Sequence, residues 1–120
     1  MLDHVSLSIS DAAKAQAFYA KALAPLGYKL VSKYAGDLGI GADGGSTICA
    51  AEGPAQKLIA HLTFQAKGRK QVDAFHKAAL YANGRDNGRP SLWQDYSPTY
   101  YAALVLDPDC NNVEAVRHTA

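Results

Sequence analysis

The sequence contains few cysteines, has no excess of positive or negative charge, and lacks a long apolar run. Its two cysteines, Cys49 and Cys110, are too few for a disulfide scaffold and lack the CxxC spacing of a structural zinc site. The chain has 12 Lys and Arg residues against 11 Asp and Glu residues without a block of like charge, which argues against a nucleic-acid partner. No segment approaches the ~20 apolar residues that span a bilayer, and the N-terminus lacks the regions of a signal peptide. We therefore expect a cytoplasmic protein with neither a nucleic-acid partner nor a membrane partner.

The sequence contains an internal repeat. The stretch "DHVSLSISDAAKAQAFYAKALAPLGY" aligns without a gap with "AHLTFQAKGRKQVDAFHKAALYANGR". The identical residues are separated by 57 positions and include His4 with His61, Phe18 with Phe75, and Gly27 with Gly84. A chain of 120 residues is the size of one domain. We therefore expect a single domain over residues 1–120, built from repeat units at about 1–54 and 58–120.

Each repeat begins with a strand pattern. Apolar residues alternate with polar ones in "HVSLSI" and again in "HLTFQ", which places His4 and His61 on the polar face of their strands. An apolar stripe of period 3.6 from Ala15 to Leu26 then predicts a helix, and a matching stripe from Val72 to Leu80 predicts a second one. Ser10 or Asp11 is suited to cap the first helix, and Gly27 and Gly84 are placed to end the two helices.

Short extended segments follow each helix. In the first repeat they lie at 28–34, 38–40 and 46–51, and in the second at "YYAALVL" and "NNVEAV", after a weak segment near 90–93. The preceding "NGRDNGRP" has the composition of a turn. Each repeat is therefore predicted to be a βαβββ unit. The predicted fold is α+β, with two βαβββ units that form a curled mixed sheet around a cavity.

Three side chains suit a metal ion in such a cavity. His4 and His61 share the polar strand face, and Glu114 lies in "NNVEAV" on the face opposite Val113 and Ala115. Two imidazoles and one carboxylate leave about half of an octahedral coordination sphere open for a substrate or for oxygen. A metal held in this way can polarise adjacent oxygens of a substrate or activate dioxygen.

The duplicated unit, "DHVSLSISD", "AHLTF" and the ending "LDPDCNNVEAV" together resemble the vicinal oxygen chelate superfamily. This superfamily includes glyoxalase I, fosfomycin-resistance transferases, bleomycin-binding proteins and extradiol dioxygenases. The resemblance covers the whole chain and implies His4, His61 and Glu114 as ligands of a divalent ion: iron, manganese, zinc or nickel. It also implies a small-molecule substrate and a homodimer.

The chain departs from the superfamily pattern at two places. Glyoxalase-like members carry a further carboxylate on the fourth strand, but Cys49 lies in that region and Glu52 falls just beyond it. The resemblance is therefore greater to members with three ligands. The turn "DPDC" has Cys110 where the superfamily has glycine, and a left-handed cysteine costs about 1 kcal/mol relative to glycine.

Two functions of different classes follow from the resemblance. One is a small metal-dependent lyase, isomerase, transferase or dioxygenase, in which Tyr100 and Tyr101 are candidate acid-base residues. The other is a metal-free binding protein of the bleomycin-resistance type. In either case we expect Trp93, Tyr96 and Arg85 to line the substrate cavity. The residues leave the substrate and the reaction open.

Overall fold

The computed structural model describes residues 5–34, 37–41, 48–52 and 60–119, with the backbone alone for residues 32–34, 37 and 49–52. His4 and residues 53–58 of the predicted joining segment 52–58 lie outside this part of the chain. The elements follow in the order β1 (Val5–Ile9), α1 (Ala12–Ala22), the 3-10 turn η1 (Ala24–Leu26), β2 (Lys29–Tyr34), β3 (Asp37–Gly41), β4 (Ile48–Glu52), β5 (His61–Gln65), α2 (Arg69–Tyr81), β6 (Arg85–Leu92), β7 (Tyr101–Leu106) and β8 (Asn112–Arg117).

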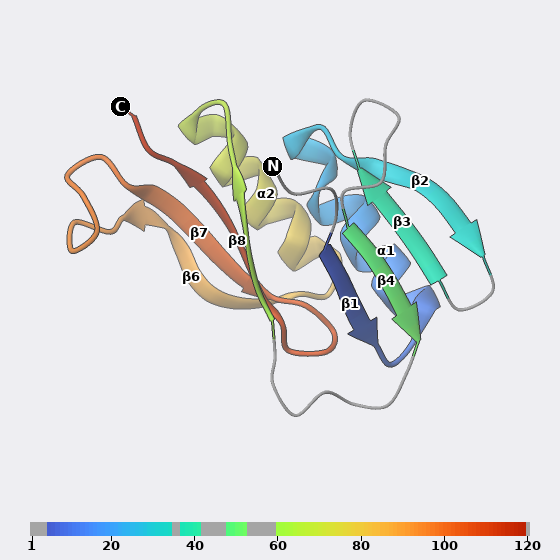
Figure 1. Ribbon diagram of the computed structural model, residues 1–120. Coiled ribbons are helices and arrows are strands. Elements are labelled where there is room, and N and C mark those ends of the chain that lie inside the picture. Colours follow the sequence, from blue (N-terminus) through green and yellow to red (C-terminus); the bar gives the residue numbers. More distant parts are fainter. Residues whose placement is uncertain (1–4, 35–36, 42–47, 53–59, 120) are drawn as a thin grey trace.

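The two halves of the chain have the same topology. The first sheet has the strand order β1-β4-β3-β2, and the second has the equivalent order β5-β8-β7-β6. In each sheet the first and last strands of the unit pair in parallel, and the remaining neighbours pair antiparallel (Figure 1). The predicted α+β fold with two βαβββ units is therefore confirmed.

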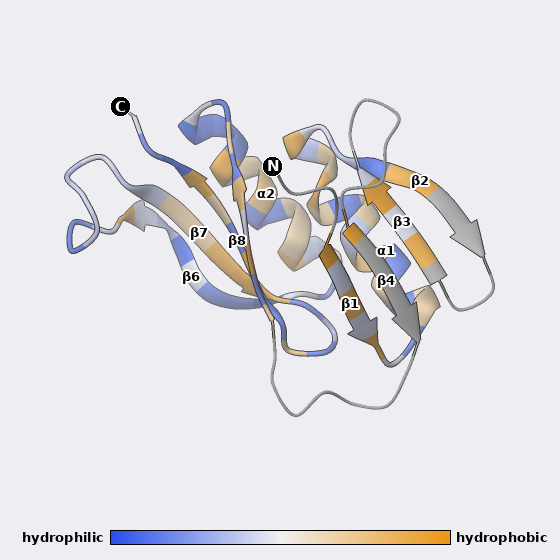
Figure 2. Cartoon of the chain, viewed as in Figure 1, coloured by the Kyte–Doolittle hydropathy of each residue, from blue (hydrophilic) through white to orange (hydrophobic). Residues whose placement is uncertain are grey.

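The curled sheet is not closed. Among the described residues no strand of the first sheet is hydrogen-bonded to a strand of the second. The units meet instead through α1 and α2, which pack on each other while each also covers one face of its own sheet (Figure 1). Buried apolar residues of both units form one core. Hydrophobic colouring marks parts of β1, β3 and β7, whereas β6 is mostly hydrophilic (Figure 2). Among the described residues, no helix covers the face of the second sheet opposite α2.

Helix α1 begins at a predicted capping residue and η1 ends at the predicted glycine, whereas α2 ends at a different residue from the predicted one. The Asp11 side chain accepts a hydrogen bond from the backbone N–H of Lys14 and caps α1, and Gly27 ends η1 with a φ of 87°. In the second unit the left-handed residue after α2 is Asn83, with a φ of 70°, and not the predicted Gly84. No helix in the described part of the chain is long and apolar enough to cross a membrane.

Strand β6 is longer than the sequence predicts. It includes most of "NGRDNGRP", because pairing with β7 makes a strand of residues whose local composition favours a turn. The register shifts on either side of Gly88, which has a φ of 156°. A Cβ atom at this position would lie 3.0 Å from the ring of Trp93. Gly88 therefore accommodates both the bulged backbone and the close approach of the indole.

A buried polar network holds the turn between β7 and β8. The Asp107 carboxylate accepts hydrogen bonds from the Tyr19 hydroxyl, at 2.5 Å, and from both the backbone and the side-chain N–H groups of Asn111. The Asn111 side-chain oxygen accepts from the backbone N–H of Ala60, directly before β5. Cys110 in this turn has a φ of 66°, so a cysteine occupies a left-handed position there. The network thus ties α1 to the adjacent ends of β5 and β8.

We expect Tyr19→Phe to change the alkaline stability of the protein. Burial, followed by the Asp107 carboxylate, raises the pKa of Tyr19 well above its usual value of 10. In the unfolded chain this tyrosine ionises near pH 10, so its contribution to stability is complete below pH 10 and is lost as the pH rises further. Between pH 10 and pH 11 the wild type should lose about 1 kcal/mol more of its free energy of unfolding than Tyr19→Phe.

Urea unfolding at pH 9, 10 and 11 measures this difference. Tyr81→Phe is the matched control, because it removes a tyrosine hydroxyl from a ring that is 80% exposed. If the free energy of unfolding fell equally with pH in the wild type and in Tyr19→Phe, the Tyr19 hydroxyl would not be sequestered in the folded protein.

Candidate functional site

Strand periodicity brings polar side chains together on the helix-free face of the second sheet. In β5, His61 and Thr63 are exposed, and Phe64 is buried on the side of the core. Parallel pairing of β5 with β8 places Glu114 opposite Thr63. On the other side of β8, Leu104 of β7 is the register partner of Glu114. The carboxylate therefore lies in the middle of the sheet, between β5 and β7.

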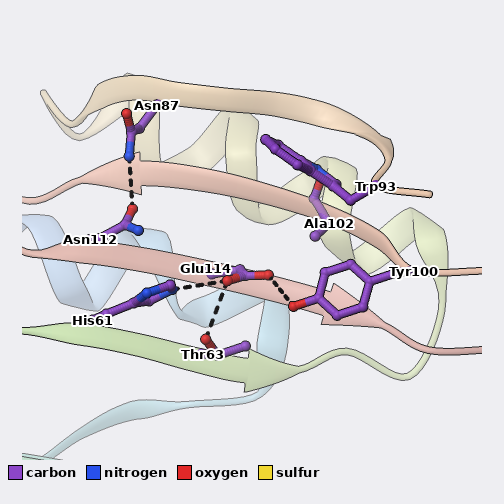
Figure 3. A network of polar contacts seen from close by, with 8 residues as sticks. All are labelled: His61, Thr63, Asn87, Trp93, Tyr100, Ala102, Asn112 and Glu114. Atoms are coloured by element: carbon purple, nitrogen blue, oxygen red, sulfur yellow. Dashed lines mark hydrogen bonds and ion pairs between the residues drawn. The ribbon is translucent and has the colours of Figure 1, made fainter. Parts of the chain in front are cut away.

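Both oxygens of the Glu114 carboxylate have partners. Oε1 lies 2.9 Å from Nε2 of His61 and accepts a hydrogen bond from the Thr63 hydroxyl at 3.3 Å. Oε2 accepts from the Tyr100 hydroxyl at 2.6 Å (Figure 3). Glu114 is 5% exposed, whereas 53% of the His61 side chain is accessible. The site is thus a buried, oriented carboxylate beside an imidazole that solvent can reach.

Tyr100 donates to this carboxylate as a neutral phenol. Its partial burial, together with the hydrogen bond to Glu114, raises its pKa to about 12. At neutral pH the hydroxyl therefore keeps its proton and orients the carboxylate. As it stands, this geometry makes Tyr100 a proton donor and not a general base.

A cavity of about 250 Å³ opens over these groups. Its floor is formed by His61, Thr63, Glu114 and Leu104. Its wall consists of Trp93, Tyr96 and Tyr100, which all lie in the loop between β6 and β7. Figure 3 shows the Trp93 and Tyr100 side chains on the same side of the sheet as Glu114.

The predicted site residues fall into three groups. His61 and Tyr100 each contact Glu114, and Trp93 and Tyr96 line the same cavity. Tyr101 and Arg85 are not brought to it. His4 lies outside the described residues, one position before β1.

Tyr101 and Arg85 are engaged elsewhere. The Tyr101 hydroxyl donates to Asp73 of α2, and its ring lies under the guanidinium of Arg69 at 4.9 Å. Tyr101 therefore faces the helix, because neighbouring residues at the start of a strand point to opposite faces. The Arg85 guanidinium donates to the sulfur of Cys110 at 2.8 Å. Neither residue is part of the cavity lining.

Sequence reasoning missed several neighbours of the site. Thr63 follows His61 at the strand period of two, so the alternation that identified His61 could also have identified it. Leu104 and the Asn87–Asn112 pair lack such a signal, since only the register of β6, β7 and β8 brings them beside the polar face. The Asn87 side-chain N–H group donates to the Asn112 side-chain oxygen at 3.0 Å (Figure 3).

The donor set suits a divalent ion in its chemistry. An imidazole nitrogen and a carboxylate oxygen, 2.9 Å apart, both contact the same polar cavity. Residues 5–34, 37–41, 48–52 and 60–119 hold no group of three or more His, Cys, Asp or Glu residues that could bind a metal. Cys49 pairs with Ser6 as Glu114 pairs with Thr63, so the equivalent position in the first unit carries no carboxylate. The described chain thus offers two donors, His61 and Glu114.

Solved structures share this architecture. A glyoxalase/bleomycin resistance protein from Albidiferax ferrireducens superposes with a TM-score of 0.80 at 24% identity over 98% of each chain. A putative glyoxalase from Bacillus halodurans has a TM-score of 0.74 at 22% identity over 98% of this chain and 95% of its own. The fosfomycin resistance protein FosX from Listeria monocytogenes has a TM-score of 0.72 at 18% identity over 100% and 92%. The chain has the vicinal oxygen chelate fold.

This finding confirms the fold that the sequence resemblance implied. At these identities the likeness establishes the fold and leaves the activity open. One FosX structure is a mutant complexed with manganese(II) and a dihydroxypropylphosphonic acid, and it matches at a TM-score of 0.73 and 18% identity over 97% of this chain and 88% of its own. No protein-family model matches the sequence, and no curated protein matches it.

Proposed function

We propose that this protein is a small enzyme that depends on a divalent metal and binds vicinal oxygens of a small substrate. The observation that carries the proposal is the buried Glu114 carboxylate, paired with His61 at 2.9 Å, at the floor of a cavity. His61 and Glu114 are the proposed ligands, together with His4. Iron, manganese, zinc and nickel all accept such donors, and lyase, isomerase, transferase and dioxygenase reactions are all compatible with this donor set.

The residues of the site have separate roles in this proposal. When bound, the metal supplies Lewis acidity toward the substrate oxygens. The Tyr100 and Thr63 hydroxyls hold the Glu114 carboxylate in one orientation through hydrogen bonds to its two oxygens. Tyr100 also carries a proton beside the substrate position, because its pKa of about 12 keeps it neutral. Trp93 and Tyr96 exclude water from one side of the cavity.

A metal-free binding protein of the bleomycin-resistance type is the second candidate. It is favoured by the hydrogen bonds that the Glu114 carboxylate already makes within the chain and by the aromatic wall of the cavity. In that case His61 and Glu114 would act as polar anchors for a ligand. Stoichiometric metal distinguishes the two candidates.

We also propose a homodimer. The described cavity is lined by residues of the second unit alone, and no helix of the described part of the chain covers the face of the sheet that carries it. A second copy of the chain could cover this face and bring its first unit to the site. The molar mass from light scattering distinguishes a dimer from a monomer.

Metal content is the measurement that tests the proposed function. Protein purified without chelator or nickel resin should carry close to one divalent ion per chain. His61→Ala and Glu114→Gln should each weaken binding by at least about 10- to 100-fold, the range measured for groups that only support a ligand. Activity should be lost with the ion, since the oxygens of the substrate then lack their Lewis acid.

His76→Gln is the matched control. His76 also lies 2.9 Å from a carboxylate, that of Asp86, but neither residue lines the cavity. The metal content of this variant should equal that of the wild type. Wild-type protein that takes up no ion after incubation with iron, manganese, zinc and nickel would contradict the enzyme proposal and leave the binding protein.

A further inference from the structure

Three aromatic rings form a continuous wall beside the carboxylate. The ring centroids of Trp93 and Tyr96 are 6.5 Å apart with planes inclined by 30°, and those of Tyr96 and Tyr100 are 4.9 Å apart. Tyr96 is 70% exposed, and Leu92 beside the wall is also exposed. A large ring in this position buries little of its own surface in the chain. Its unused face is therefore available to a ligand.

The wall is held in place before any ligand arrives. The backbone N–H of Trp93 donates to the carbonyl of Tyr100 at 2.8 Å, and that of Tyr96 donates to the carbonyl of Trp93 at 3.0 Å. The indole N–H donates to the carbonyl of Ala102 at 3.3 Å (Figure 3). The Tyr100 hydroxyl then connects the wall to Glu114. Little conformational entropy would be lost when a ligand stacks on such a surface.

The described lining carries no cationic side chain of the kind that binds phosphate or phosphonate. The described residues that line it include neither Lys nor Arg, and Glu114 is the one carboxylic acid among them. Arg85 donates instead to Cys110. Bidentate Arg contacts are the usual means of holding phosphate groups in proteins, and the described lining of this cavity provides none. A strongly anionic ligand is therefore disfavoured next to the buried carboxylate.

We propose that the ligand of this site is a molecule with one flat unsaturated ring and no phosphonate or phosphate group. Its ring stacks on Tyr96 and Trp93, while its vicinal oxygens reach His61 and Glu114. The cavity of about 250 Å³ suits one ring with a small polar head. The inference rests on the proposed function, because the oxygen end of the ligand uses the proposed metal ligands. The proposed ligand differs in this respect from the phosphonic acid that is bound in the FosX structure.

Hydroxamates provide probes that share one chelating group and differ only in what it carries. Benzohydroxamate has a flat ring, cyclohexanecarbohydroxamate has a saturated ring of similar size, and phosphonoacetohydroxamate has a phosphonate. Binding is followed in manganese-loaded and in metal-free protein by calorimetry and by the fluorescence of Trp93, the single tryptophan of the chain. Because the chelating group is constant, differences in affinity report on the wall and on the charge.

Benzohydroxamate should bind about 2- to 12-fold more tightly than the cyclohexane compound, the range for an aromatic pair beyond simple burial. It should also quench the fluorescence of Trp93, and phosphonoacetohydroxamate should bind most weakly of the three. Tyr96→Leu should remove most of the preference for the flat ring and leave the metal content unchanged. Tyr81→Leu is the control, since this exposed tyrosine contacts Lys21 outside the cavity.

The outcomes separate this inference from the proposed function. Equal affinity for the two ring compounds, or tighter binding of the phosphonate, in protein that holds metal would overturn the inference alone. A flat-ring preference in the metal-free protein, with no effect of manganese, would support the stacking on Tyr96 and Trp93 and would contradict the enzyme proposal. Failure of all three probes to bind either form would overturn the inference.

Discussion

Replacement of Asp107 by alanine is expected to lower the free energy of unfolding by about 3 kcal/mol or more. Asp107 is 2% exposed, and its carboxylate accepts hydrogen bonds from Tyr19, from two groups of Asn111 and from the backbone N–H of Asp109. The variant would leave the Tyr19 hydroxyl and the Asn111 amide buried without their acceptor. Each such group costs about 1–3 kcal/mol.

The same substitution should weaken the candidate site. Asn111 holds the backbone of Ala60, directly before His61, so the network positions β5 against β8. We therefore expect Asp107→Ala to reduce metal affinity as well as stability, although Asp107 does not line the cavity. Metal titration at a temperature where the variant is folded separates the two effects.

Urea unfolding followed by circular dichroism measures the loss of stability. Asp95→Ala is the matched control, because Asp95 is an exposed residue of the loop between β6 and β7. Its stability should lie within about 0.5 kcal/mol of the wild type. A loss of less than about 1 kcal/mol for Asp107→Ala would show that the buried network contributes little.

Gly84→Ala is expected to destabilise the protein by about 3 kcal/mol, at the upper end of the range for overpacked cores. A Cβ atom at this position would lie 2.6 Å from side-chain atoms of Phe18 and Val105 and 2.7 Å from the backbone oxygen of Ala79. These distances are too short for a non-bonded Cβ atom, and the backbone oxygen belongs to the last turn of α2. The strand β6 would have to move away from the core to relieve them.

Thermal and urea unfolding measure the effect. Gly68→Ser serves as the control, since nothing lies within 4 Å of a Cβ atom at Gly68. Gly68 is also the N-cap of α2, where serine is favoured, so this variant should be as stable as the wild type or slightly more so. If Gly84→Ala were to match the wild type within about 0.5 kcal/mol, the packing argument would be wrong.

Gly84 illustrates where sequence reasoning reaches its limit. Its alignment with Gly27 correctly indicated an equivalent position in the two units, but it suggested the wrong physical role. Gly27 ends its helix in the left-handed region, whereas Gly84 allows Phe18 of α1 to pack against it. The first role depends on the local backbone and can be read from the sequence. The second depends on a residue 66 positions away (84 minus 18).

The tyrosines next to the site show the same division. Tyr100 and Tyr101 are adjacent in the sequence, and the pattern did not say which of them faces the cavity. The start of β7 places Tyr100 toward Glu114 and Tyr101 toward Asp73 of α2. Likewise, the polar composition around Gly88 favoured a turn until pairing with β7 extended β6 across it.

The sequence by itself determined the two βαβββ units, the faces of their first strands and the candidate ligands His61 and Glu114. These features follow from the internal repeat and from strand and helix periods, which act over a few residues. Only the tertiary structure decided that the two sheets remain separate and that Tyr100 orients the carboxylate. It alone also placed Arg85 away from the cavity and the aromatic wall beside Glu114. These features depend on register and on contacts between distant segments, which local periodicity does not encode.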